Sequence, residues 1–133
     1  MKNSTKIVAL ALVLVGISFT SVAAGTKEKA VAKATEAVEN ASPDDWMLLA
    51  KQADYLIRKD VALATAKEWV EQSISIKEDA YNLEVFGDYY AKNNLHKQAI
   101  GYYLKSADQV KLDNPGADTT WLQDKIMVSK SQI

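Results

Sequence analysis

The sequence predicts an all-α protein built from antiparallel helical hairpins that stack side by side. Three observations predict this fold class. Apolar residues recur every three or four positions in several segments. Capping and turn residues separate these segments from one another. The pattern of a helix pair also occurs twice along the chain, at an offset of 33 residues.

Residues 1–24 are predicted to be a cleavable signal peptide. Two lysines precede an apolar run over residues 7–19, and the small residues Val22 and Ala24 have the spacing that favours cleavage after Ala24. An uncleaved anchor helix is the alternative. The short run disfavours it, because a membrane span needs about 20 apolar residues. We therefore expect a periplasmic or secreted protein with no stable membrane insertion after cleavage.

The charge and cysteine content limit the class of function. Removal of residues 1–24 would take away two lysines and no acid, so the 16 Lys and Arg become 14 against 17 Asp and Glu. The resulting charge of about −3 disfavours binding to nucleic acid and to anionic membranes. The chain has no cysteine, which excludes disulfides, thiolate metal sites and cysteine nucleophiles.

Residues 25–41 are rich in Ala, Lys and Glu, and Val31 and Val38 are their only sizeable apolar residues. Two valines bury little surface, and short helices are marginal in water unless they are docked. We expect a tether that is disordered or weakly helical. A heptad seam that pairs with another chain is the alternative.

Residues 42–133 are predicted to form one helical domain, which begins at the sequence "SPDDW". Ser42 can cap the first helix, Pro43 suits its first turn, and Asp44 and Asp45 favour the positive end of the helix dipole. This first helix carries apolar residues at helical spacing and ends at the polar residues 58–60.

Four further helices are expected after this break. The second has its apolar stripe over residues 62–74, the third runs over about 80–92, and the fourth over about 96–112. The turn "DNPG" ends the fourth helix. Asp118 or Thr119 can cap a fifth, whose apolar side would be Trp121, Leu122, Ile126 and Met127. We expect this last helix to cover the open end of the stack.

The 33-residue shift places Ala66 on Ala99, Val70 on Tyr103 and Ser73 on Ser106. The second unit, "AYNLEVFGDYYAKNNLHKQAIGYYLKSADQVKLD", resembles the tetratricopeptide repeat. The resemblance implies a right-handed stack of antiparallel helical hairpins with a C-terminal capping helix. It makes Gly87 and Ala99 the small residues at the helix contact, with large packing residues around them: Leu83, Phe86, Tyr90, Ile100 and Tyr103.

The first unit, residues 47–79, matches the family only by register. Ala50 stands where a large packing residue is usual, and Asp54 stands where a small one is usual. The proline that ends each unit in the family is missing from both units. A generic array of helical hairpins is the alternative interpretation.

Candidate groups for chemistry are few. His96 is the only histidine, and its position between two helices favours a packing or capping role over that of a general base. The segment "DNPGAD" lacks the alternating oxygen ligands and the closing glutamate of a calcium loop, so we expect a turn there. The sequence therefore predicts no catalytic, cofactor or metal site, and no enzyme.

The family resemblance implies that the first helix of each unit lines a concave face that binds a protein partner. Helical phase places nine residues there: Leu48, Lys51, Tyr55, Arg58, Lys59, Tyr81, Glu84, Asp88 and Lys92. The two-carboxylate clamp of the family is absent from these positions, and a solvated helix face is the alternative. We expect an exported, non-catalytic adaptor or scaffold that binds a peptide or protein segment. The alternative is an envelope protein that self-associates through Trp121 and the terminal helix, or through Val31 and Val38.

Overall fold

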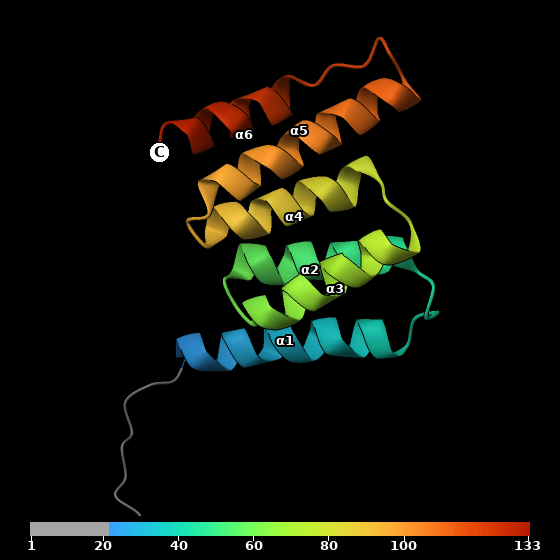
Figure 1. Cartoon of the computed structure of the whole chain (residues 1–133). Helices are drawn as coiled ribbons and strands as arrows, with labels where there is room; N and C mark the ends of the chain where they lie inside the picture. The colour runs from blue at the N-terminus through green and yellow to red at the C-terminus, as the bar shows by residue number, and fades with distance from the viewer. Residues whose placement is uncertain (1–21) are drawn as a thin grey trace, which may run out of the picture.

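The computed structural model describes residues 22–133, with side chains from Gly25 onward. These residues form six helices and no strand, which confirms the all-α prediction. The helices are α1 (Val22–Glu39), α2 (Trp46–Lys59), α3 (Leu63–Ile76), α4 (Ala80–Lys92), α5 (His96–Asp113) and α6 (Thr120–Lys130). Consecutive helices run in opposite directions, and the chain progresses from α1 at one end to α6 at the other (Figure 1).

The prediction that residues 25–41 form a disordered or weakly helical tether is wrong. Residues 22–39 form helix α1, and this helix packs against α2. Ala30 is 6% exposed and Ala34 is fully buried, at a spacing of four residues on one face. Small side chains allow two helix backbones to approach closely, so α1 docks without large apolar residues. Val31 packs partly against the same core, which places it inside this chain.

The predicted signal peptide lies almost entirely outside the described residues. Its last three residues, 22–24, form the beginning of α1. Cleavage after Ala24 stays a prediction, and it would leave Ala30 and Ala34 in place against α2.

Helix α2 has a different cap from the expected Ser42. Asp45 is the N-cap, and its side chain accepts a hydrogen bond from the backbone amide of Leu48 at 2.9 Å. The Ser42 hydroxyl instead donates to Asp44. Asp60 then ends the helix in the left-handed conformation, at the predicted polar break.

The predicted bounds of the third helix agree with α4. Asp79 and Asn82 form a capping box at its start, in which each side chain accepts from a backbone amide at the helix end. Asn94 adopts a φ of 58° in the turn that follows, as the asparagine pair predicts.

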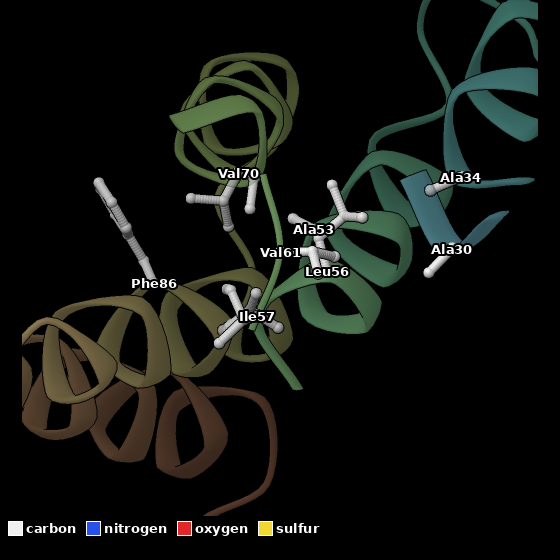
Figure 2. Close-up of a cluster of buried hydrophobic side chains, with 10 residues drawn as sticks. Ala30, Ala34, Ala53, Leu56, Ile57, Val61, Val70 and Phe86 are labelled. Carbon is white, nitrogen blue, oxygen red and sulfur yellow. The ribbon is translucent and has the colours of Figure 1, made fainter. Parts of the chain in front are cut away.

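The larger hydrophobic core joins the first four helices. The alanines of α1 pack against α2, and branched and aromatic side chains of α2, α3 and α4 make up the rest of this core (Figure 2). Leu56 and Val70 are fully buried within it, and Phe86 is 4% exposed. Its buried members are Ala30, Ala34, Ala53, Leu56, Ile57, Val61, Ala66, Val70, Val85 and Phe86.

A second, smaller core attaches α6 to α5. Leu122 and Ile126 of α6 pack with Ala99 and Tyr103 of α5. Trp121 and Met127, which the apolar pattern also assigned to the packed side, are 43% and 63% exposed. The buried face of α6 is therefore narrower than predicted, although the helix does cover one end of the row of helices (Figure 1).

Each of the two hairpins contains an equivalent serine hydrogen bond, and the two serines are related by the sequence repeat. The buried hydroxyl of Ser73 donates to the backbone oxygen of Trp46 at 2.7 Å, and that of Ser106 donates to the backbone oxygen of Ala80 at 2.7 Å. Each bond joins the second helix of a pair to the first residue of the first helix. The 33-residue repeat therefore has a structural counterpart at its serines.

Replacing Ser106 by alanine is expected to lower the free energy of unfolding by about 1 kcal/mol, because the backbone oxygen of Ala80 loses its buried partner. Urea denaturation followed by circular dichroism measures this loss. Ser75→Ala is the matched control, because the exposed Ser75 hydroxyl bonds only within its own helix. Equal effects of the two substitutions would contradict a structural role for the repeated bond.

Candidate partner-binding surface

The nine predicted partner-binding residues lie on α2 and α4, two helices in contact. The structure brings four of them together around one pocket and draws three others into ion pairs within the chain. Lys59 lines a second pocket. Leu48 is half-buried and does not line either of these pockets.

A pocket of about 390 Å³ opens on the surface where α1, α2 and α4 supply side chains. We call it the Tyr55 pocket. The predicted residues Lys51, Tyr55, Arg58 and Tyr81 are joined there by two that were not predicted, Lys33 and Gln52. Lys33 was missed because the helix that carries it was expected to be a tether.

Asp54 fixes two residues of this pocket from below the surface. Its Oδ2 lies 2.6 Å from Nη2 of Arg58, and the Tyr81 hydroxyl donates to the same oxygen at 3.4 Å. Asp54 is 14% exposed, whereas Arg58 is 72% exposed. The residue that departs from the small-residue pattern of the repeat thus orients an exposed guanidinium group.

The electrostatics of this trio keep the Tyr81 hydroxyl a hydrogen-bond donor. Burial raises the pKa of Asp54, and the positive charge of Arg58 opposes that shift. Burial together with the nearby Asp54 carboxylate raises the pKa of Tyr81 to about 12. Tyr81 is therefore protonated at neutral pH.

A second pocket, of about 240 Å³, is also lined by Tyr55. We call it the Lys59 pocket, and its lining residues are Thr26, Lys27, Ala30, Tyr55 and Lys59. Tyr55 is common to both pockets. The ammonium groups of Lys33 and Lys59 lie 6.0 and 5.9 Å from the centre of its ring. These distances are at the outer limit of a cation–π contact, so the ring holds both lysines weakly.

The acidic half of the predicted surface is occupied by α6. Lys125 places its Nζ 2.7 Å from Glu84 Oε1 and 2.8 Å from Asp88 Oδ1. The indole nitrogen of Trp121 donates to Glu84 Oε2 at 3.2 Å. Glu84 and Asp88 were predicted to bind a partner, but in the structure both carboxylates are paired with Lys125 of the same chain.

Helix α5 adds a further hydrogen bond to this cluster. The buried hydroxyl of Tyr103 donates to Asp88 Oδ1 at 2.7 Å. Burial acts to lower the pKa of Lys125, but the hydrogen bonds to Asp88 and Glu84 outweigh it and raise that pKa. Burial and the Asp88 carboxylate likewise raise the pKa of Tyr103. Lys125 and Tyr103 are therefore both protonated at neutral pH.

The sequence spacing of these residues could have indicated that each helix presents two of them on one face. Glu84 and Asp88 are four residues apart on α4, and Trp121 and Lys125 are four residues apart on α6, so each pair lies on one helix face.

Lys92, the last predicted residue of α4, places its Nζ 3.6 Å from Oδ1 of the exposed Asp60.

His96 is the first residue of α5 and lines a pocket of about 410 Å³ with residues of α6. Its buried Nδ1 has no hydrogen-bond partner among residues 25–133. The helix start has Leu95 as its N-cap residue without a side-chain cap, so His96 does not cap it. Of the two roles predicted for His96, capping is therefore wrong. Its position between α5 and α6 supports packing.

The segment "DNPGAD", residues 113–118, forms the predicted turn. The side chain of Asn114 accepts from the Gly116 amide at 3.1 Å, and that of Asp118 accepts from the Thr120 amide at 2.8 Å. Within the described residues, no group of three or more histidine or acidic side chains is arranged to hold a metal ion. No helix between residues 22 and 133 has the length and apolar character needed to cross a bilayer.

The fold and this surface define the chain as an all-α protein with a basic, tyrosine-walled pocket on α1, α2 and α4. No protein-family model, curated protein or solved structure matches the chain.

Proposed function

We propose that this chain is an exported, non-catalytic interaction module of tetratricopeptide-like architecture. Its Tyr55 pocket holds a segment of another protein. The observation that carries the proposal is that pocket, where Lys51, Tyr55, Arg58 and Tyr81 come together from two helices that are adjacent in space. Tyrosine and arginine are enriched at protein interfaces, because they combine apolar contact with hydrogen bonding.

The chemistry of the pocket supports binding over catalysis. Its lining contains lysine, arginine, glutamine and tyrosine, and none of these side chains is a carboxylate or an imidazole. A general base that works near neutral pH would be one of those two groups in most enzymes. The two tyrosine rings instead offer flat apolar surface beside hydrogen-bond donors.

Two features support the tetratricopeptide-like architecture. The repeated serine bonds give both hairpins the same internal link. Gly87 approaches the ring of Tyr103 so closely that a Cβ atom would lie 2.5 Å from Cε1. This is the close contact that the resemblance assigns to Gly87, and Ala99 is fully buried in the same hairpin.

Site-specific photo-crosslinking in the native envelope tests this function. Benzoylphenylalanine in place of Gln52, which lines the pocket, is expected to give an adduct with a partner protein. The same group in place of Glu68, an exposed residue of α3, is the control and should give none. The combined change Tyr55→Leu and Tyr81→Leu should remove the adduct without altering the circular dichroism spectrum.

Adducts of equal yield from positions 52 and 68 would refute partner binding at this pocket. An adduct that contains a second copy of this chain would instead support the self-associating alternative. Mass spectrometry of the crosslinked peptide distinguishes these outcomes.

A further inference from the structure

Five cationic side chains line the two pockets that share Tyr55. Lys33, Lys51 and Arg58 line the Tyr55 pocket, and Lys27 and Lys59 line the Lys59 pocket. Among the described residues, no aspartate or glutamate lines either pocket. The whole chain has 17 acidic residues against 16 basic ones, so this local excess of positive charge runs against its overall balance.

Four of these five cations have no carboxylate partner within the part of the chain that the structure describes. Arg58 is paired with Asp54, but no ion pair within residues 25–133 involves Lys27, Lys33, Lys51 or Lys59. By contrast, Lys125 of α6 forms ion pairs with both Glu84 and Asp88 on the same face. Within residues 25–133, the lysines of the two pockets are thus without an ion pair, whereas Glu84 and Asp88 share Lys125.

We infer that the partner segment is acidic and extended, and that it lies across both pockets with Tyr55 between two of its side chains. This inference rests on the proposed function and names the chemistry of the partner. Carboxylates of the segment would meet the lysines, whose ammonium groups can donate charge-assisted hydrogen bonds to them. An extended chain presents every second side chain to the same side, which suits two pockets that share one lining residue, Tyr55.

The overall charge of the chain favours an acidic peptide over a nucleic acid. The formal net charge is −1, and it becomes about −3 if residues 1–24 are removed as predicted. A long polyanion would meet repulsion from the rest of the surface, whereas a short acidic segment would interact with the pockets alone.

Fluorescence anisotropy with three labelled probes and the purified full chain tests the inference. The probes are a short peptide that alternates glutamate with tyrosine, its counterpart with lysine in place of glutamate, and a single-stranded oligonucleotide of similar length. We expect binding of the glutamate peptide alone, with an affinity that falls as salt is added.

Charge reversal then locates the site. Lys33→Glu together with Lys51→Glu is expected to weaken binding of the glutamate peptide by about tenfold or more. The matched control is Lys97→Glu together with Lys130→Glu, which makes the same change of charge at exposed positions on α5 and α6. Both variants alter exposed side chains, and their helicity should equal that of the parent chain.

Three outcomes would overturn the inference. One is a failure of the glutamate peptide to bind, another is tighter binding of the oligonucleotide, and the third is an equal loss from the control variant. If the peptide fails but position 52 still crosslinks to a partner, the binding function stands and only the acidic chemistry is wrong. If neither experiment gives a signal, both proposals fail.

Discussion

Replacing Gly87 by valine is expected to lower the free energy of unfolding by about 3 kcal/mol. A Cβ atom at this position would lie 2.5 Å from Cε1 and 2.6 Å from Cδ1 of Tyr103. The ring cannot move aside easily, because Tyr103 is 2% exposed and its hydroxyl is bonded to Asp88. The added side chain would therefore force α4 and α5 apart.

Gly101→Val is a control with the same chemistry. Gly101 also lies inside a helix, but a Cβ atom there would meet nothing within 4 Å. Valine has a better helix propensity than glycine, so this variant should be as stable as the parent chain or slightly more stable. Urea denaturation followed by circular dichroism measures both variants, and equal stabilities would contradict the packing of α4 on α5.

A double-mutant comparison attributes the cost to the Tyr103 ring. Gly87→Ala is expected to be less destabilising in the background of Tyr103→Leu than in the parent chain, because leucine has no atom in the place of the ring edge. Additive effects would indicate that a different neighbour opposes the Cβ atom.

The sequence could predict Gly87 and the bounds of α4 because both depend on information close in the chain. The glycine belongs to a repeat motif, and the ends of α4 are marked by Asp79 and by the asparagine pair after it. Local signals of this kind also predicted the polar break after α2 and the turn that contains Asn114.

The position of α1 could not be predicted by counting large apolar residues. Its contact with α2 depends on Ala30 and Ala34, and alanine occurs throughout this segment on buried and exposed faces alike. The missed helix also hid Lys27 and Lys33, which belong to the two pockets beside Tyr55. The predicted surface was therefore less basic than the one the structure shows.

Glu84 and Asp88 are occupied by contacts with residues of α6 that lie 37 positions later in the sequence, Trp121 and Lys125. Helical phase placed both carboxylates on one face of α4, but it gave no information about which later helix would reach them. The same limit applies to Asp54, whose charge marked a departure from the repeat and whose partners, Arg58 and Tyr81, became clear only in three dimensions.

Replacing Lys125 by methionine is expected to lower the free energy of unfolding by about 2 kcal/mol. The substitution keeps the apolar stem and removes the charge that lies between Glu84 and Asp88. Both carboxylates are partly buried, with exposed fractions of 21% and 27%, and they would then repel each other across one helical turn. Lys130→Met is the control, because Lys130 is exposed on the same helix and should change the stability by less than about 0.5 kcal/mol.

The pH dependence gives this prediction a distinctive signature. Because the pKa of Lys125 is raised in the folded chain, its contribution is fully present below the ordinary lysine value of about 10.4 and is lost as the pH rises through the higher folded value. The stability difference between the parent and Lys125→Met should therefore stay constant from neutral pH to about pH 10 and close only above it. Adding Glu84→Gln and Asp88→Asn to Lys125→Met should restore most of the loss, because the neutral amides no longer repel. A variant that stays destabilised after both amides are introduced would show that Lys125 acts through packing and not through its charge.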